Sequence, residues 1–322
     1  MNFKMRALKS IGGYLGLDYS IKNDILNSKY CFNSARSSLL FYLKYKNIKK
    51  IWVPHYTCGN FLETLCKNEI DLIYYNIDEN YEITTNIPDN DDIIYVNYYG
   101  IKDQYIKKIS TEKKKIIIDN CQAFFNRQIN KLPTFSCPRK FIGVADGGAL
   151  ECQDQLNLDD IDVDISHDRM SHLLKQIDID TVTGYSDFIS NEKVLESSSI
   201  KRMSRLTKKI IDSVDVNFIV SSRYNNFQYL NNNLYKHNLL KIDNVSLYYY
   251  PLMVTNPKVI RKKLLENRIF TPILWNDRLK YLNDGVEKKL ISRVINLPID
   301  QRYNQDDMDA ILNILNEENC HT

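Results

Sequence analysis

The sequence of 322 residues contains no apolar run that approaches the roughly 20 residues needed to cross a membrane. Its first ten residues, MNFKMRALKS, also lack the apolar core of a signal peptide. The seven cysteines are irregularly spaced, form no CxxC pair and define no disulfide framework. These absences predict a cytoplasmic protein with no part inserted in a membrane.

Several motifs of nucleotide and metal chemistry are missing as well. The sequence has neither a GxGxxG nor a Walker sequence, so nothing indicates a dinucleotide or nucleoside triphosphate site. The five histidines are scattered and form no HExxH-type metal pair. A formal net charge of +3 is too small to indicate binding to nucleic acid or to a membrane surface. We therefore expect neither a metal centre nor a nucleic-acid partner.

Short apolar runs alternate with more polar segments in the first 120 residues of the chain. Strands are predicted at Ile51–Pro54, Leu72–Tyr75, Ile93–Asn97 and Lys115–Asp119, and helices at Ser37–Tyr45 and Phe61–Lys67. This alternation is typical of an α/β protein with a mostly parallel sheet that helices cover on both faces. Ligands of such sheets bind at the C-terminal ends of the strands, where Asn97 and Asp119 fall.

The rest of the chain divides into a polar middle and a second, smaller α/β pattern. Residues 153–190 are expected to form a surface loop that leads into a helix near Met170–Ile177. Further helices are predicted at Ile200–Val214, Phe218–Leu234, Pro257–Asn267 and Asp306–Glu317, and strands at Val245–Val254 and Val294–Leu297. We therefore predict a large domain over residues 1–215 and a small C-terminal α/β domain over residues 216–322.

The segment between residues 115 and 148 carries the most specific chemistry. An apolar run ends in Asp119, Gln122 follows three residues later, and a lone lysine, Lys140, stands in a Ser/Pro/Arg context. Pyridoxal 5'-phosphate (PLP) needs an acid for its ring nitrogen and an amine that holds it as a Schiff base. The segment therefore indicates a PLP site in which Asp119 and Lys140 meet the cofactor.

Six motifs stand in a fixed order along the chain. They are Asn33-Ser34-Ala35-Arg36-Ser37, Pro54-His55-Tyr56-Thr57-Cys58, Asn97-Tyr98-Tyr99-Gly100, Ile118-Asp119-Asn120-Cys121-Gln122-Ala123, Phe135–Lys140 with Asp146–Gly148, and Asn296-Leu297-Pro298-Ile299. Together they resemble the DegT/StrS-type nucleotide-sugar aminotransferases over about Phe32 to Leu315. The resemblance implies the PLP-dependent type I (aspartate aminotransferase) fold and a homodimer whose active site lies at the subunit interface.

The resemblance also implies roles for the residues around the cofactor ring. Lys140 would form the Schiff base and, once the substrate amine releases it, shuttle a proton, which requires a lysine pKa lowered by burial and neighbours. Asp119 would pair with the pyridine nitrogen and keep it protonated. Gln122 would donate a hydrogen bond to the phenolic oxygen of the cofactor.

The cofactor phosphate is expected at the start of the first helix. Ser34, Ala35 and Arg36 stand there, where free backbone N–H groups and the helix dipole attract an anion. Ser34 is equally explained as an ordinary N-cap. Arg36 replaces a threonine of the family and points either to the phosphate or to solvent. The hydroxyl of Ser136 would be a further phosphate ligand.

Besides Arg36, two residues and one segment depart from the family pattern. Cys58 stands where the family has an aromatic residue that stacks on the cofactor, so that stacking passes to Tyr56 or is lost. Asn97 replaces a histidine and would reach the ring oxygen of the cofactor. The segment Ile200–Ser204 lacks the phosphate-binding asparagine of the family's inter-subunit segment. These departures leave the substrate, and full activity, open.

The sequence thus predicts a PLP-dependent aminotransferase that moves an amino group from an amino acid such as glutamate to a keto sugar, nucleotide-linked, in bacterial surface-polysaccharide (O-antigen or capsule) synthesis. Related sugar dehydratases have a histidine in place of Lys140, which favours amino transfer over dehydration. Two alternatives stay open: a PLP-dependent dehydratase or eliminase, and a degenerate homologue with a binding role. A sugar-nucleotide transferase is less supported, since no strong acidic metal-binding pair is present.

Overall fold

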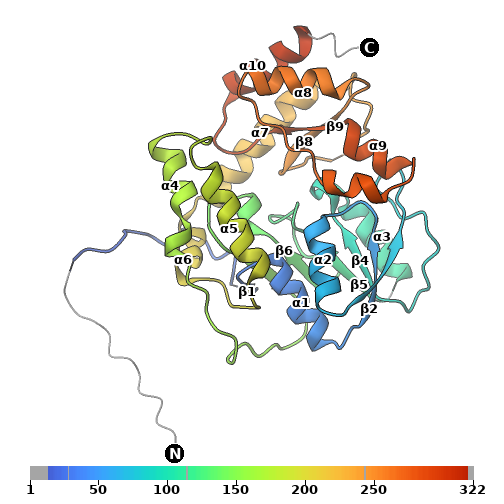
Figure 1. The fold of residues 1–322 in the computed structure, drawn as a ribbon, viewed down its shortest axis with the longest axis vertical. Coiled ribbons are helices and arrows are strands. Elements are labelled where there is room, and N and C mark those ends of the chain that lie inside the picture. Colours follow the sequence, from blue (N-terminus) through green and yellow to red (C-terminus); the bar gives the residue numbers. More distant parts are fainter. Residues whose placement is uncertain (1–13, 28, 114, 243, 318–322) are drawn as a thin grey trace, which may run out of the picture.

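The computed structural model describes residues 14–27, 29–113, 115–242 and 244–317 (Figure 1). The first ten residues, which carry the prediction about a signal peptide, lie outside the described residues. Within the described part, no helix combines the length and the apolar character that crossing a membrane requires. The cytoplasmic location stays a prediction.

A seven-stranded sheet forms the centre of the larger part of the molecule. Its strands are β1 Tyr30–Phe32, β2 Lys50–Pro54, β3 Asp71–Tyr75, β4 Ile93–Val96, β5 Ile116–Asp119, β6 Thr134–Ser136 and β7 Gly148–Glu151. The strand order is β1-β7-β6-β5-β4-β2-β3. The pairs from β3 to β6 are parallel, and β7 runs antiparallel to both β6 and β1. The predicted α/β fold with a mostly parallel sheet is confirmed.

The central strands are apolar at almost every position because both faces of the sheet are covered. All four residues of β5 are buried, and so are all four of β4. Ile117 packs in a cluster with apolar residues of α1 (Ala35–Tyr45) and α2 (Gly59–Lys67), whereas Ile116 and Ile118 pack in the cluster on the opposite face. Alternate residues of one strand therefore hold the two layers of helices in place.

A second sheet lies in the C-terminal part of the chain, at the top of Figure 1. Its two strands, β8 Tyr249–Met253 and β9 Val294–Pro298, are antiparallel. The remaining helices are α3 Asp103–Glu112, α4 Ser171–Asp178, α5 Tyr185–Ser197, α6 Arg205–Ser213, α7 Val216–Leu234, α8 Pro257–Glu266, α9 Val286–Arg293 and α10 Gln305–Glu317. Of these, α7, α8 and α10 pack together around the small sheet.

The two sheets fall on opposite sides of the predicted domain boundary. The large sheet uses strands between residues 30 and 151, and the small sheet uses strands between residues 249 and 298. Helix α7 begins at Val216 and contacts β8 and α10. The division into residues 1–215 and 216–322 itself stays a prediction.

Some predicted boundaries are wrong in informative ways. Helix α5 follows α4 where only one helix was expected. The helix predicted from Ile200 begins only at Arg205, because Met203 donates a backbone hydrogen bond to Cys31 and continues the edge of the sheet. The strand predicted from Val245 begins at Tyr249.

Candidate active site

Four predicted site residues follow the C-terminal ends of three neighbouring parallel strands. Asn97 follows β4, Asp119 ends β5 and Ser136 ends β6. Lys140 closes a one-turn helix, Pro138–Lys140, just beyond β6. Because the carboxyl ends of parallel strands meet at one edge, the topology places these residues in one region of the molecule.

Asp119 is a buried carboxylate with few partners. Its side chain is 9% exposed, and Oδ1 accepts a hydrogen bond of 2.8 Å from the backbone N–H of Cys121. Burial raises the pKa of Asp119, and the nearby positive charge of Lys140 opposes that shift. A cationic N–H at this position would stabilise the carboxylate, which is what a protonated pyridine ring offers.

Lys140 lines a cavity of about 580 Å³ and is accessible to solvent from it. Its Nζ lies 5.3 Å from the centroid of the Tyr248 ring. Burial among protein atoms acts against the ammonium form, yet the pKa of Lys140 is raised overall, because the ionised forms of Tyr248, two cysteines and Asp119 would surround it with negative charge. This differs from the lowered lysine pKa expected from the chemistry, and it describes the protein without a bound cofactor.

Arg139, the immediate neighbour of Lys140, is held elsewhere. Its guanidinium forms an ion pair with Glu192 of α5, and both side chains are largely buried. Lys140 and Arg139 therefore face different partners, so the amine near Asp119 is that of Lys140.

Gln122 contains a buried hydrogen-bond donor without a partner. Its Oε1 accepts a 2.7 Å hydrogen bond from the N–H of Tyr99, which fixes the orientation of the amide. The residue is 2% exposed, and its Nε2 is among the buried polar atoms that have no hydrogen bond. Because an unpaired buried donor is costly, this amide is suited to an oxygen atom of a ligand.

The start of α1 is packed against the turn that follows Lys140. Ser34 caps the helix, since its Oγ accepts from the N–H of Ser37 at 3.1 Å and lies 2.9 Å from the hydroxyl of Ser37. The N–H of Gly147 donates to the carbonyl of Asn33 at 2.7 Å. A Cβ atom on Gly148 would lie 2.2 Å from the backbone of Ser34. Glycine is therefore required where the two segments meet.

Ala35 and Arg36 form the first turn of α1 and are partly exposed. Among the described residues, Arg36 has no ion-pair partner. Backbone N–H groups of a first helical turn have no acceptor within the helix, so this turn and its neighbouring guanidinium can receive an anion such as a phosphate.

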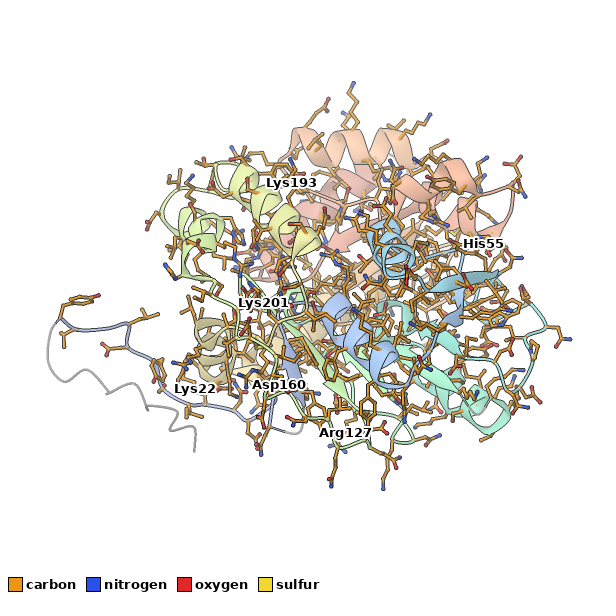
Figure 2. All side chains as sticks on the ribbon, turned by 60° about the horizontal axis from the view of Figure 1, so that its bottom comes forward. Lys22, His55, Arg127, Asp160, Lys193 and Lys201 are labelled. Carbon is orange, nitrogen blue, oxygen red and sulfur yellow. The ribbon has the colours of Figure 1, made fainter. Side chains whose placement is uncertain are left out.

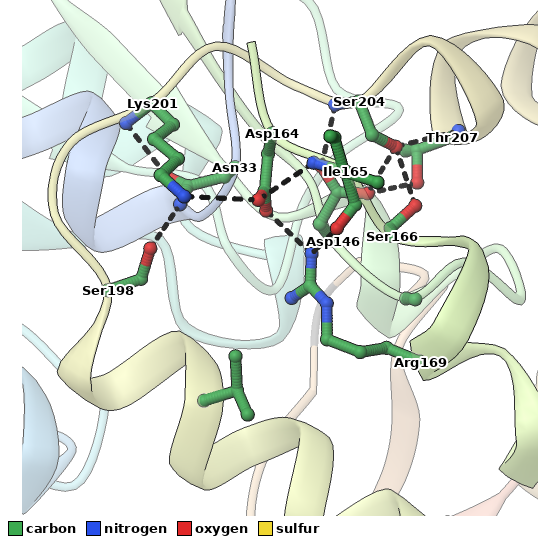
Figure 3. A network of polar contacts seen from close by, with 12 residues as sticks. Asn33, Asp146, Asp164, Ile165, Ser166, Arg169, Ser198, Lys201, Ser204 and Thr207 are labelled. Atoms are coloured by element: carbon green, nitrogen blue, oxygen red, sulfur yellow. Dashed lines mark hydrogen bonds and ion pairs between the residues drawn. The ribbon is translucent and has the colours of Figure 1, made fainter. Parts of the chain in front are cut away.

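A polar network fixes the same turn from the other side (Figure 3). Asp146 is fully buried and accepts from the N–H of Ser204 at 2.8 Å, from its hydroxyl at 2.7 Å, and from the hydroxyl of Thr207. In the same network Asp164 is paired with Arg169 and Lys201. The segment that departs from the family's inter-subunit pattern therefore packs, in this chain, beside the start of α1.

Asn97 lies at the C-terminal end of β4, at the same edge of the sheet as Asp119, but its side-chain amide is fully hydrogen-bonded to protein groups. Nδ2 donates to Asp103 at 2.8 Å and to Asn120 at 3.1 Å, and Oδ1 accepts from the N–H of Lys102 at 3.0 Å. Asn97 thus anchors the loops after β4 and β5. The prediction that Asn97 contacts the cofactor stays untested, and its amide has no free donor for that contact.

Tyr56 and His55 point into other surroundings. Tyr56 is 1% exposed, and its ring packs edge-on against Trp275 at 4.4 Å within an aromatic cluster. The ring of His55 stacks on Tyr74 at 4.9 Å, and burial lowers its pKa. Figure 2 shows His55 well away from Lys193 of α5. The aromatic ring next to Lys140 is instead that of Tyr248, which sequence reasoning missed.

The cavity beside Lys140 has a mixed, strongly polar wall. It is lined from the α4–α5 pair, α7 and the C-terminal part of the chain by residues that include Arg139, His172, Glu192, Arg223, Tyr248, Asp300 and Arg302. Burial lowers the pKa of Arg223 to about 10. Apart from Arg139, which lies in the Phe135–Lys140 motif, these residues belong to no motif identified in the sequence, so only the fold brings them together. The described residues contain no cluster of acidic, histidine and cysteine side chains suited to a metal ion.

No family model matches the sequence, and no curated protein matches it. Solved structures do match, among them a DegT DnrJ EryC1 StrS aminotransferase from Brucella abortus, 14% identical with a TM-score of 0.57, covering 90% of this chain and 85% of that one. PseC of Helicobacter pylori, an aminotransferase involved in pseudoaminic acid biosynthesis, is 14% identical with a TM-score of 0.63 and covers 91% and 88%.

A third match is NtdA from Bacillus subtilis with bound cofactor PMP, 14% identical with a TM-score of 0.62, covering 89% of this chain and 73% of that one. At these low identities the likeness concerns the fold. The resemblance found in the sequence is confirmed at that level: the chain has the fold of the DegT/DnrJ/EryC1/StrS sugar aminotransferases.

Proposed function

We propose that this protein is a PLP-dependent aminotransferase that acts on a sugar. The observation that carries the proposal is that the amine of Lys140 lies near the buried carboxylate of Asp119 at one sheet edge. The loop that follows Asp119 also carries the unpaired amide donor of Gln122. Each of them offers what one part of PLP requires.

The residues fit PLP as a bound group. Asp119 would hold the ring nitrogen, Gln122 Nε2 would donate to the ring oxygen, and the first turn of α1 with Ala35 and Arg36 would hold the phosphate. When bound, PLP supplies an electron sink for charge that develops on the substrate carbon.

Lys140 is the residue that holds and moves the proton. Its Nζ would attach the cofactor in the resting protein and, once released, would carry a proton between the substrate carbon and the cofactor. The negative charge of Asp119 would keep the ring nitrogen protonated throughout. The cavity beside Lys140, which opens to solvent, provides room for the substrate next to that amine.

The finer parts of the proposal concern the substrates and the assembly. We propose an amino acid, glutamate, as donor and a nucleotide-linked keto sugar as acceptor, used in surface-polysaccharide synthesis. Arg223 on the cavity wall, whose hydrogen bonds go to neutral groups, supports anionic substrates, whereas Arg139 and Arg302 already pair with Glu192 and Asp300. A cytoplasmic homodimer is part of the proposal. Its support is the apolar surface of the α4–α5 pair, where Leu174, Ile177 and Tyr185 are 56%, 82% and 61% exposed.

Two observations favour the second candidate, a degenerate homologue with a binding role. The amide of Asn97 is occupied by protein groups, and the ring of Tyr56 is enclosed in an aromatic cluster, so neither is free to meet a cofactor. A dehydratase or eliminase on the same fold is distinguished by its products, ammonia or a deoxy sugar instead of an amino sugar.

The decisive experiment is a visible spectrum of the protein with PLP, followed by borohydride reduction and peptide mapping. We expect one stable adduct, on Lys140, and its complete loss in Lys140→Ala. Lys193→Ala on the exposed side of α5 is the matched control and should retain the adduct. A folded wild-type protein without any adduct would refute the catalytic proposal and leave the binding role.

A further inference from the structure

Tyr248 brings the C-terminal part of the chain into direct contact with Lys140. It immediately precedes β8, it is 8% exposed, and the centroid of its ring lies 5.3 Å from Lys140 Nζ. An ammonium group over an aromatic face is attracted by the quadrupole of the ring. This contact therefore favours one position of the Lys140 amine among those that its flexible side chain allows.

Other aromatic rings hold the Tyr248 ring in this position. Its centroid lies 4.3 Å from that of Tyr249 and 5.8 Å from that of Phe141, the residue after Lys140. The titratable groups that act on Lys140 and Tyr248 come from α2, β5, the one-turn helix and β8: Cys58, Asp119, Cys121, Cys137 and Tyr249. Arg223, Asp300 and Arg302 lie behind them on the cavity wall.

One buried guanidinium connects the two segments that carry Lys140 and Tyr248. Arg223 of α7 is 3% exposed and donates to the carbonyl of Leu247 at 2.7 Å, the residue before Tyr248. It also donates to the carbonyl of Phe141 at 3.3 Å, the residue after Lys140. Its Nε donates to Gln301, whose own amide donates to the same Phe141 carbonyl at 2.9 Å.

Among the described residues, the hydrogen bonds of Arg223 go to neutral acceptors, which is unusual for a buried cation. A planar guanidinium with several fixed donors can bridge two carbonyl groups at a set separation, which a lysine cannot. The role that these contacts define is to keep the Phe141 and Leu247 segments at a constant distance.

We propose that Tyr248 is a positioning residue for Lys140, and that Arg223 fixes the distance between the segments that carry them. The ring holds the amine on the cavity side of the sheet edge, toward the carboxylate of Asp119. The catalytic meaning of this arrangement rests on the proposed function. The position and the proton affinity of the amine do not, and they can be measured in the protein without PLP.

The test is competitive acetylation of Lys140 across a range of pH, followed by peptide mass spectrometry. Tyr248→Leu removes the ring, so the ammonium form loses its attraction and the profile shifts to lower pH. Acetylation at neutral pH should become about threefold to tenfold faster. Tyr248→Phe keeps the ring face. Because burial raises the pKa of the Tyr248 hydroxyl, that hydroxyl carries no charge at neutral pH, and the acetylation rate of Tyr248→Phe there should match the wild type. Tyr224→Leu, on an exposed part of α7, is the control and should change nothing.

Arg223→Lys is a second variant that tests the same arrangement if Tyr248→Leu does not fold. It should shift the acetylation profile of Lys140 in the same direction, by less. The proposal is overturned if the folded Tyr248→Leu and Arg223→Lys proteins both keep the profile of the wild type. It is equally overturned if Tyr248→Phe behaves as Tyr248→Leu, since the ring face would then not matter.

The failure of this proposal and the failure of the proposed function have different signatures. If no PLP adduct forms but the acetylation profile still depends on the ring of Tyr248, the proposed function is refuted and the positioning role is retained. A normal adduct on Lys140 with an unchanged profile in the variants would do the reverse. Tighter binding of PLP to Tyr248→Leu would also overturn the proposal, because the ring would then obstruct the site.

Discussion

The two ends of the candidate site differ in how their polar side chains are satisfied. At the ring end, Gln122 has a buried donor without a partner, and Asp119 is a buried acid whose pKa is raised. At the phosphate end, the hydroxyl of Ser34 is already used to cap α1. Asn97, which follows β4 beside the strand that ends in Asp119, has both its amide oxygen and its amide nitrogen hydrogen-bonded. The free donor of Gln122 therefore sets it apart from Ser34 and Asn97, whose polar groups are used to maintain the fold.

The largest effect is expected for Asp119→Asn. The amide cannot hold a positive charge on the ring nitrogen, so the reaction of PLP-loaded protein with an amino donor should slow roughly 10²- to 10³-fold, the scale of one lost preorganised electrostatic contact. Single-turnover visible spectroscopy measures this rate. Asp178→Asn at the exposed end of α4 is the control. An unchanged rate in Asp119→Asn would remove the carboxylate from the mechanism.

The same substitution should stabilise the protein without PLP at neutral pH. Burial raises the pKa of Asp119, so the folded state binds its proton more tightly than the unfolded state. Stability of the wild type is then lost as pH rises from the ordinary aspartate pKa through the raised one, and Asn does not titrate. In urea unfolding, the stability of the variant relative to the wild type should increase as pH rises through this range. If the difference in unfolding free energy between the variant and the wild type did not change with pH, the raised pKa of Asp119 would be contradicted.

Gln122→Glu and Asn97→Ala test the comparison directly. Gln122→Glu keeps an oxygen that accepts from Tyr99 and replaces the unpaired donor with a second carboxylate oxygen, which would repel the phenolic oxygen of the cofactor, so PLP affinity should fall about tenfold or more. Asn97→Ala removes three internal hydrogen bonds and should lower the free energy of unfolding by about 3 kcal/mol, with unchanged affinity in the folded fraction. Fluorescence titration and urea unfolding measure the two quantities. If Asn97→Ala lost PLP affinity and Gln122→Glu lost only stability, Asn97 would be the cofactor contact and Gln122 the structural residue.

The smallest effect is expected at Ser34. Ser34→Ala removes the N-cap and should lower the free energy of unfolding by about 1 kcal/mol. Ser34→Asp keeps a capping oxygen and adds negative charge where we expect the phosphate, so stability should recover while PLP binding weakens. Equal PLP affinity in Ser34→Asp and the wild type would place the phosphate elsewhere.

The sequence predicts best where the pattern of apolar residues is long and uninterrupted. The runs that end at Pro54, Tyr75 and Asp119 were placed to within one residue, because buried parallel strands are apolar on both faces. Lys140 and Asp119 could be assigned to one region from the same reasoning, since the strand ends share one edge.

Elements with few apolar residues could not be predicted in this way. The strands β1, β6 and β7 have three or four residues each, and their pairing is defined by neighbours distant in sequence. Helix α5 carries polar residues along its buried side, including Asn191, whose amide donates to the carbonyl of Ala145. Tyr248 lies in a segment predicted as the middle of a strand, and only the packing of the C-terminal part brings it to Lys140.

The close approach of Gly148 to Ser34 has a consequence for how such a protein can be altered. A side chain at Gly148 would overlap backbone atoms at 2.2 Å, whereas a Cβ on Gly143 would meet only a Leu173 side-chain carbon at 3.5 Å. A library randomised over residues 141–148 and selected for any activity should therefore keep glycine at 148 and diversify at 143. Position 143 is therefore free to acquire new specificity, whereas position 148 is fixed by the geometry of the backbone.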